Sequence, residues 1–381
     1  MRGTLTGRAA GTRSARRRWA WPVALLVGML AFALVSAAIG ALTESGPRSW
    51  RISVLAQKLD HLRRHGADYD TLFLGSSRVH YGLDPTLFDA EMTRQGCPAR
   101  SFNMGVQALT LAEEHRLVEE LARIGRWKRV VLERNPVPLR SLELLGTDRG
   151  TLGFGTLTGV RLALQDLWTS PVNPLERLWS MAEVVMVGAY EQLGIGRIAR
   201  LVRRPGSDEL PTDDRVVTMD RAGFVAIEQE TDPVMRERVA GIDRERLNDF
   251  IRQTRELSGP APQLGERRMA LIREQIDHAR MVAGKVSLVV WPHSRPQWAQ
   301  DARAIGEAAA EGRLGDAPII NLGDPAQVPE LFVPELWHDN LHLYTAGTEM
   351  VTRAIAAQLC AAERAAAVQP AHPETLAAGH P

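Results

Sequence analysis

Only two cysteines, Cys97 and Cys360, occur in the 381 residues of the chain. Two isolated cysteines cannot build a disulfide-rich scaffold, and they cannot supply the ligands of a structural zinc site. Acidic and basic residues nearly cancel, with a formal net charge of +1, so the composition gives no electrostatic sign of a nucleic-acid partner. With 45% hydrophobic and 24% charged residues, the chain has the composition of a globular protein.

Two widespread motifs are also missing. Gly75-Ser76-Ser77 is not followed by a lysine at the spacing that a phosphate-binding loop requires. His338 and His342 are four residues apart, as in the zinc-protease motif, but Asp339 stands where that motif needs glutamate, and the sequence offers no obvious third ligand. We therefore expect no metal and no other cofactor.

One long apolar run is present, from Trp19 to Thr43, and it carries no charge. At about 1.5 Å per residue, a helix over this run would exceed the ~30 Å thickness of a hydrocarbon core. Trp19 and Trp21 suit a membrane interface. Arginines precede the run and Glu44 follows it, which favours an N-terminus in the cytoplasm; these arginines are Arg2, Arg8, Arg13, Arg16, Arg17 and Arg18.

We therefore expect residues 1–18 to form a basic cytoplasmic tail and residues 19–43 a single-pass signal anchor in the inner (plasma) membrane. The alternative is a cleaved signal peptide, with the small residues Ser36-Ala37-Ala38 near the cut. In both cases the body lies in the periplasm or another extracytoplasmic space. No second run of comparable length follows.

The body alternates between strand and helix patterns. Short apolar runs predict strands at residues 69–74, 100–104, 129–132, 286–291 and 319–322. Helical spacing predicts helices over residues 44–68 (a stalk or first helix) and around 117–124, 269–279 and 351–359. Such alternation predicts a parallel sheet with helices on both faces, whose sites form at the carboxyl ends of the strands.

Several chemically useful residues fall just past predicted strand ends, namely Ser77, Gly105, Asn135 and His293. We expect residues 69–140 and 266–362 to form the core. Residues 141–265 break the pattern and are expected to be an insertion, which either packs on the core or forms a lid or substrate groove over the site. The Ala- and Pro-rich residues 363–381 are expected to be a disordered tail.

These motifs resemble those of the SGNH (GDSL-like) hydrolases. Gly75-Ser76-Ser77 resembles the Gly-Asp-Ser block, with serine in place of its aspartate, and Asp339-Asn340-Leu341-His342 matches the late Asp-x-x-His. The resemblance implies an α/β fold with a flavodoxin-like three-layer α/β/α core of the SGNH type. To this core the chain would add an inserted helical lid region and an N-terminal transmembrane helix.

The resemblance assigns Ser77 as the nucleophile, His342 as its base and Asp339 as the residue that orients the histidine. The chemistry agrees, because a serine hydroxyl needs a base within hydrogen-bond reach. The predicted oxyanion-hole donors are Ser77, the N–H of Gly105 and the side chain of Asn135. The alternative for Gly105 is a structural role as the glycine of a turn at a strand end. The alternative for Asn135, which precedes Pro136, is a structural role as a turn residue.

Roles can also be expected for other residues near the motifs. Ser76 is expected to bond its own loop. Arg78 and His293 are candidates for substrate contact; the alternatives are a solvated helix face for Arg78 and a structural role for His293. In the expected fold, Cys97 and Cys360 lie near helix ends on one face of the sheet. A disulfide and two free buried thiols both remain open.

The N-terminal anchor and the Gly-Ser-Ser variant are similar to one subset of the family. This subset includes exported proteins of alginate O-acetylation and of teichoic-acid D-alanyl transfer. The resemblance implies a serine esterase or O-acyltransferase that acts on a cell-envelope carbohydrate, with a membrane acyltransferase as a candidate partner. A non-catalytic scaffold is the main alternative. A lipid-ester hydrolase, with an acyl channel lined by Trp168, Trp179 and Met181, is another.

Overall fold

The body is built on a five-stranded parallel sheet. The computed structural model describes residues 21–32, 34, 35, 38, 53–134, 144, 145, 147–195, 219–227 and 242–368. The strands are β1 (Thr71–Leu74), β2 (Ser101–Asn103), β3 (Trp127–Arg134), β4 (Ala283–Val290) and β5 (Ile319–Asn321), in the order β2-β1-β3-β4-β5. The predicted α/β class and parallel sheet are confirmed, and each strand lies where the sequence predicted one.

The sheet reverses its winding direction between β1 and β3. From β1 the chain moves to one side to form β2, and it then returns past β1 to form β3, β4 and β5. Ligands of open parallel sheets bind at the carboxyl ends of the strands beside such a reversal. Leu74 is paired with Leu132, so the residues after β1 face the last residues of β3. This register brings Gly75 next to Glu133.

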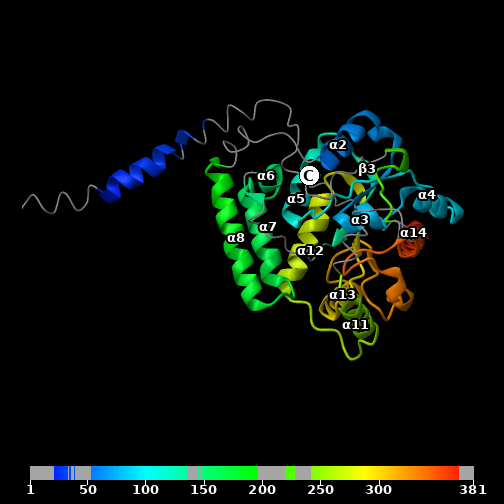
Figure 1. The fold of residues 1–381 in the computed structure, drawn as a ribbon. Helices are drawn as coiled ribbons and strands as arrows, with labels where there is room; N and C mark the ends of the chain where they lie inside the picture. Colours follow the sequence, from blue (N-terminus) through cyan, green and yellow to red (C-terminus); the bar gives the residue numbers. More distant parts are fainter. Residues whose placement is uncertain are drawn as a thin grey trace, which may run out of the picture.

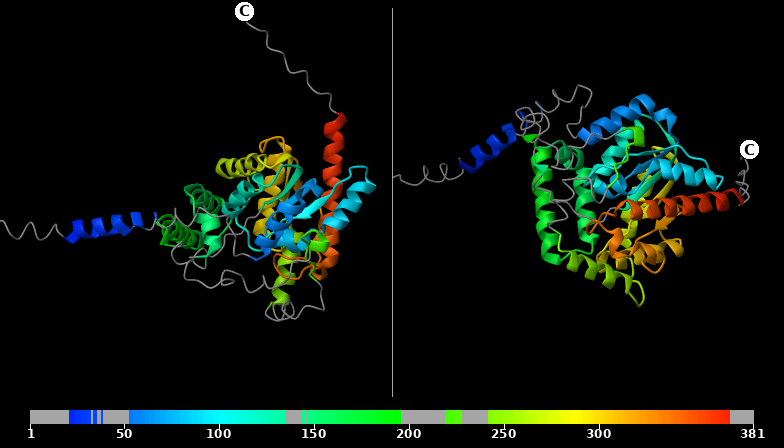
Figure 2. Two further views of the ribbon diagram at one scale, coloured as in Figure 1. Left: turned by 90° about the horizontal axis from the view of Figure 1, so that it is seen from above. Right: turned by 45° about the vertical axis from the view of Figure 1, so that its right-hand side comes forward.

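Alternate strand residues point to opposite faces, and helices cover both faces (Figures 1 and 2). Leu72, Leu132 and Leu288 pack on one face, which is covered by α2 (Ser53–His65), α5 (Leu111–Ala122), α12 (Glu266–Ala279) and α13 (Pro296–Ala310). Phe73, Val131 and Val289 pack on the other, with α3 (Ser77–Gly82), α4 (Pro85–Arg94), α11 (Arg244–Arg255) and α14 (Thr345–Val368). The sheet is therefore the middle of three layers.

Two expected boundaries differ from the structure. The apolar residues of α2, including Leu55 and Leu59, are buried in the core, so the segment expected to be a stalk belongs to the body. Helix α14 extends to Val368, so residues 363–368 are helical and not part of a tail. Residues 369–381 lie outside the described residues.

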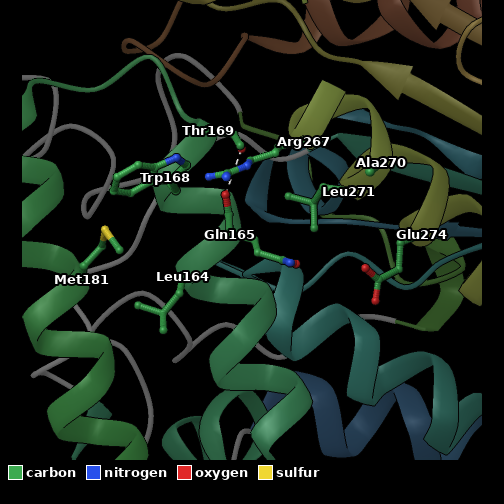
Figure 3. A pocket seen from close by; sticks show the side chains of 9 residues that line it. All are labelled: Leu164, Gln165, Trp168, Thr169, Met181, Arg267, Ala270, Leu271 and Glu274. Carbon is green, nitrogen blue, oxygen red and sulfur yellow. Dashed lines mark hydrogen bonds between the residues drawn. The ribbon is translucent and has the colours of Figure 1, made fainter. Parts of the chain in front are cut away.

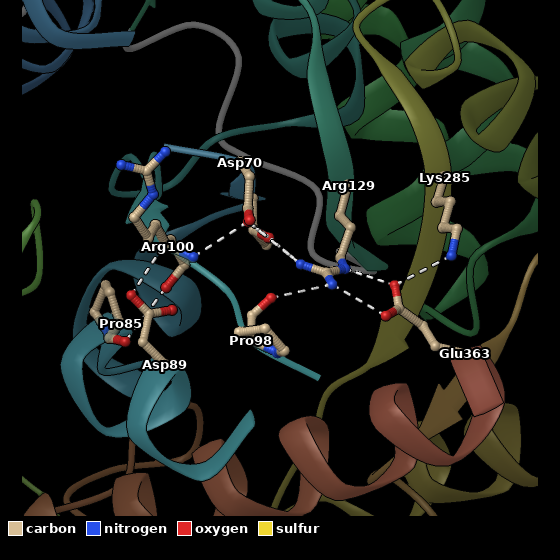
Figure 4. Close-up of polar contacts among 10 residues, drawn as sticks. Asp70, Pro85, Asp89, Pro98, Arg100, Arg129, Lys285 and Glu363 are labelled. Carbon is tan, nitrogen blue, oxygen red and sulfur yellow. Dashed lines mark hydrogen bonds and ion pairs between the residues drawn. The ribbon is translucent and has the colours of Figure 1, made fainter. Parts of the chain in front are cut away.

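A buried ion pair explains why α14 continues so far. Arg129 belongs to β3, and its guanidinium is buried. It donates hydrogen bonds to the carboxylate of Glu363 at 3.0 Å, to the Pro98 carbonyl at 3.4 Å and to the carboxylate of Asp70 at 3.3 Å (Figure 4). A buried guanidinium needs such partners, because leaving it unpaired would cost several kcal/mol. Glu363 also pairs with Lys285 at 3.4 Å. These contacts fix the last turns of α14 to the sheet.

The described residues of the expected insertion fall into three parts, of which residues 219–227 contact β2 through a hydrogen bond from the Asn103 N–H to the Ala222 carbonyl. Helices α6 (Asp148–Phe154), α7 (Leu157–Thr169) and α8 (Pro174–Gln192) form a helical unit at one side of the body (Figure 1). Asp166 of α7 bonds the buried Arg134 at 2.7 Å and so joins this unit to the end of β3. Helix α11, in contrast, contacts α13 and contributes Leu247 and Ile251 to the hydrophobic core on the second face of the sheet.

Residues 21–32, 34, 35 and 38 are helical, and their large apolar side chains are exposed. Within the described residues, no helix is both long and apolar enough to cross a membrane. The expected anchor, residues 19–43, lies partly outside the described residues.

Cys97, which follows α4, forms a disulfide with Cys360 of α14. Their Cα atoms are 5.7 Å apart, and the bond spans 263 residues of sequence. Of the two alternatives that the sequence left open, the structure contains the disulfide.

Breaking this disulfide is expected to lower the free energy of unfolding by about 2–5 kcal/mol, since the unfolded chain regains the freedom of a very long loop. The measurement is urea unfolding of the full chain with and without a thiol reductant. The Cys97→Ser/Cys360→Ser double variant should resemble the reduced protein and ignore the reductant. Equal unfolding midpoints for oxidised and reduced protein would contradict the prediction.

Candidate active site

Ser77 lies at the turn that follows β1. It is the first residue of α3, and Ser76 is the N-cap, whose side chain accepts a hydrogen bond from the Arg78 N–H at 3.3 Å. This is the local structural role expected of Ser76. Gly75 makes the turn, and a Cβ at this position would collide with Glu133 and Val79. Only glycine therefore lets the strand pass this close to β3.

A buried carboxylate, Glu133 at the end of β3, holds the turn in place. It accepts hydrogen bonds from the N–H of Ser76 and, at 3.0 Å, from the Ser76 hydroxyl. The same carboxylate forms an ion pair with the guanidinium of Arg78, and both side chains are at most 2% exposed. Arg78 is therefore not on a solvated helix face, which was the alternative for this residue, and its substrate contact stays a prediction.

Asp339 and His342 lie on a tight turn. The Asp339 carboxylate accepts hydrogen bonds from the N–H groups of Leu341 at 2.7 Å and His342 at 2.9 Å, as short polar side chains do in turns. The N–H of His338 donates to the His342 carbonyl at 2.9 Å, and Trp337 and Leu343 form an antiparallel bridge at the base of the turn. The turn brings the Asp339 and His342 side chains together.

The structure brings Ser77, His342 and Asp339 into one hydrogen-bonded chain. The Ser77 hydroxyl is 2.7 Å from Nε2 of His342, and Nδ1 of the same ring is 2.8 Å from the Asp339 carboxylate. When Nδ1–H donates to Asp339, Nε2 is left as the acceptor for the serine proton. This arrangement can activate a serine nucleophile.

Neighbouring groups stabilise the ionised form of the Asp339 carboxylate. Burial alone would raise the pKa of Asp339, but the charge of His342 and hydrogen bonds from His338, His342 and the Leu341 N–H hold that pKa well below its usual value. Asp339 therefore stays ionised and can hold the imidazole in one orientation. Tyr81 contacts the His342 ring edge to face, with 5.9 Å between ring centroids.

Gly105 is close to this region, but its predicted oxyanion role is not what the structure shows. Its N–H donates to the side-chain oxygen of Asn103 at 2.9 Å, and its carbonyl accepts from the buried Lys58 ammonium at 2.7 Å. A Cβ at Gly105 would collide with the backbone of His80, so glycine is required for close packing against α3. The residue is a structural contact between two loops.

Asn135, the other predicted oxyanion donor, lies outside the described residues, and its role stays a prediction. The N–H of Ser77 itself belongs to the first turn of α3, where amide groups have no intrahelical acceptor.

His293, just past β4, is buried. Its Nδ1 accepts a hydrogen bond from the Arg295 N–H at 3.1 Å, and its ring packs 5.6 Å from the Trp298 ring. Burial lowers the pKa of His293 well below its usual value, and the nearby Arg78 charge adds to this effect. A neutral His293 lines a cavity of about 340 Å³ that also contacts Asn173, Glu176, Gln297, Asn340 and Leu341.

This cavity adjoins the triad, because Asn340 and Leu341 are the two residues between Asp339 and His342. Asn340 is held by Ser294, whose hydroxyl is 3.1 Å from the Asn340 side-chain oxygen. The cavity lining is part polar and part apolar. A substrate group could lie in this cavity beside the triad.

A second cavity, of about 360 Å³, lies between α7, α8 and α12 (Figure 3). Trp168 and Met181 line it with Leu164 and Leu271, which matches two of the three residues expected in an acyl channel. Trp179, the third, is 67% exposed and is not part of this lining. The cavity is lined by none of the triad residues and none of the residues beside them.

Two groups of described residues bring three potential metal-ligand atoms within 4.8 Å of one another: His338, Asp339 and His342, and His115, Glu119 and His278. In the first group, both nitrogens of His342 already contact Ser77 and Asp339. In the second, the two imidazole rings stack and Glu119 pairs with Arg116. The first group is thus arranged for proton transfer along the Ser77–His342–Asp339 chain.

Sequence reasoning missed Glu133, Asn103 and Lys58, which hold the loops around the site. Glu133 had a usable signal, because it is an acidic residue in the strand run that ends at Asn135-Pro136. Asn103 and Lys58 had none, since their partners lie in distant parts of the chain. Asn103 binds the carbonyls of Val79 and Leu83 at 2.6 and 2.8 Å.

No protein-family model matches the chain, and no curated protein matches it either.

Replacing Glu133 with glutamine is expected to lower the free energy of unfolding by about 3–5 kcal/mol, because the buried Arg78 guanidinium loses the charge of the carboxylate that it contacts. The measurement is urea unfolding of the full chain. Glu330→Gln, at an exposed carboxylate, is the matched control and should change little. An equal effect of the two substitutions would contradict the role given to Glu133.

A neighbouring carboxyl group predicts a pH dependence of stability. Burial raises the pKa of Glu114 to about 8; the Glu133 charge adds to this, and a hydrogen bond from Gln275 at 2.7 Å opposes it. The folded state therefore binds more protons than the unfolded state between the usual value of 4.5 and about 8. The free energy of unfolding should fall as the pH rises through this range.

Glu114→Gln should remove this part of the pH dependence and stabilise the protein most at the alkaline end, because an uncharged amide replaces a group that folding must keep protonated. The measurement is urea unfolding over the same pH range, with the exposed Glu311→Gln as control. Curves for Glu114→Gln that run parallel to those of the unaltered protein would disprove the assignment.

Proposed function

We propose that the chain is an extracytoplasmic serine esterase or O-acyltransferase that acts on a cell-envelope polysaccharide or glycoconjugate. The observation that carries the proposal is the 2.7 Å contact between the Ser77 hydroxyl and Nε2 of His342, with Asp339 behind the imidazole. Such a contact is what nucleophilic catalysis by serine needs. The same contact favours catalysis over the alternative of a non-catalytic scaffold.

In the proposed reaction, the Ser77 oxygen attacks the carbonyl carbon of an acyl ester while its proton moves to Nε2 of His342. The tetrahedral intermediate collapses, and His342 returns the proton to the departing alcohol oxygen, which leaves an acyl-serine. Water or a sugar hydroxyl then loses its proton to His342 and attacks this ester. The second collapse returns the proton to Ser77 and releases an acid or an acylated sugar.

The oxyanion of each intermediate needs fixed donors, and each is worth roughly 10²–10³ in rate. Gly105 is not among them, because its N–H is bonded to Asn103. In the proposal, the Ser77 N–H at the start of α3 supplies one donor and Asn135 another. No cofactor takes part in these steps.

Three features support the finer family assignment, a flavodoxin-like core of the SGNH type. The strand order β2-β1-β3-β4-β5 is that of flavodoxin-like sheets. The nucleophile candidate follows the first strand, and the Asp-x-x-His turn directly precedes the last helix, α14. The Cys97–Cys360 disulfide supports an oxidising compartment, in agreement with an exported body and an N-terminal anchor.

The cavity beside the triad supports a hydroxyl-rich acceptor. Asn173, Glu176 and Gln297 give it donors and acceptors that suit sugar hydroxyls. The apolar cavity that holds Trp168 and Met181 has no lining residue in common with it, which gives less support to a lipid-ester hydrolase. A membrane acyltransferase that delivers the acyl group remains part of the proposal.

The test is covalent labelling of the full chain by a fluorophosphonate probe, read by intact mass, together with hydrolysis of an activated acetyl ester. Ser77→Ala and His342→Ala should abolish labelling and lower kcat by about 10³–10⁶-fold, as loss of a triad member does. Both variants should retain the native circular dichroism spectrum.

Ser76→Ala is the matched control, because Ser76 is adjacent but bonds Glu133. The Ser76→Ala variant should still be labelled by the probe. Its free energy of unfolding should fall by about 1 kcal/mol, because α3 loses the N-cap hydrogen bond of the Ser76 side chain. Labelling that persists in Ser77→Ala, or no labelling of the folded unaltered chain, would refute the proposed nucleophile.

A further inference from the structure

Helix α8 carries an apolar stripe on its outer side. Its large members are between 40% and 77% exposed and recur at intervals of three, four or seven residues: Leu175, Leu178, Trp179, Val185, Met186 and, just after the helix, Leu193. Ala182 and Ala189 are exposed between them and complete the same face. This periodicity is that of one face of a helix.

The other side of α8 already has its partners. Val184 and Val187 pack with Phe154 and Leu167 in the core of the helical unit. Glu183 and Glu191 are also buried on this side, and Glu191 accepts a hydrogen bond from Thr151 at 2.8 Å. The inner side of α8 therefore holds both apolar and acidic side chains, and a second apolar face remains on the outer side. A face of this size and composition is typical of an interaction site.

We propose that this face lies on the surface of a lipid bilayer, with its apolar side chains among the outer parts of the acyl chains. At about 1.5 Å per residue the helix presents a straight, convex stripe nearly 30 Å long. Trp179 lies on the stripe, and a tryptophan suits the boundary between headgroups and acyl chains. Of the charged residues of α8, Glu176 in the first turn is exposed, Arg177 is half-buried, and the other two, Glu183 and Glu191, are buried.

Other parts of the chain favour a bilayer over a protein partner. The uncharged run that ends at Thr43 is connected to Ser53 of α2 by a segment that can span at most about 35 Å. If that run is in a membrane, the body stays close to the bilayer, and even weak docking becomes favourable. In Figures 1 and 2, α8 lies on the side of the body nearest the described helical residues 21–32, 34, 35 and 38.

Charge is also complementary. The sequence that follows α8 contains four arginines, Arg197, Arg200, Arg203 and Arg204, and no acidic residue before Asp208. Anionic lipid headgroups attract such a basic segment.

Docking would also orient the site. Glu176 and Asn173, at the start of α8, line the cavity beside the triad. A body that rests on α8 therefore holds this cavity at the membrane surface. The docking itself does not depend on the proposed esterase or acyltransferase activity.

The experiment places a nitroxide label at Met186→Cys in the full chain and reconstitutes it into vesicles of phosphatidylethanolamine and phosphatidylglycerol. Among the described residues no cysteine is free, and both cysteines of the sequence are in the disulfide, so the new thiol is labelled alone. Collisions with oxygen, which concentrates in lipid, and with a nickel chelate, which stays in water, report the depth of the label. We expect a depth of about 5–10 Å below the headgroups.

Thr86→Cys is the matched control, since Thr86 is exposed on α4, at the opposite side of the body in Figure 1. Its label should collide with the nickel chelate as freely as in water. If the label at Met186→Cys collided with the nickel chelate as freely as in water, the proposal would be overturned, and a protein partner would be the alternative for this face. Lipid-like collisions at both positions, or a chain that does not float with the vesicles, would overturn it as well.

Discussion

The arrangement of the site depends on the contacts that the buried carboxylate of Glu133 makes. It binds the N–H and hydroxyl of Ser76 and the guanidinium of Arg78, the residues on either side of Ser77. The serine between them is left with its hydroxyl directed toward His342. The carboxylate reaches this turn from the neighbouring strand β3, so the acidic group that holds the turn comes from outside the Gly75-Ser76-Ser77 segment.

Much of the core could be predicted because its signals are local. Each predicted strand overlaps an observed one, since buried parallel strands appear in sequence as short apolar runs closed by turn residues. The pairing of Ser77 with His342 was predicted from the resemblance of their two motifs and from the need of a serine nucleophile for a base, although 265 residues separate them. The structure brings the two side chains together.

The errors concern what each polar group binds, which depends on distant residues. For Arg78 the alternative was a solvated helix face, but the side chain is buried and forms an ion pair with Glu133 of another strand. Gly105 was expected to offer its N–H, but Asn103 accepts that hydrogen bond. The end of α14 was expected to be disordered, but Glu363 is needed as a counter-ion for Arg129. No local sequence pattern indicates these partners, because each pair forms only when the helices and the sheet have packed together.

The disulfide has a consequence for the integrity of the site. Cys97 follows the segment that carries Ser77, and Cys360 follows the segment that carries His342. The covalent link spans 263 residues, and the Ser77–His342 contact spans 265, so the two close almost the same loop. A single proteolytic cut anywhere between Cys97 and His342 would therefore leave both halves of the triad in one covalently joined molecule, each still attached to its own half of the disulfide.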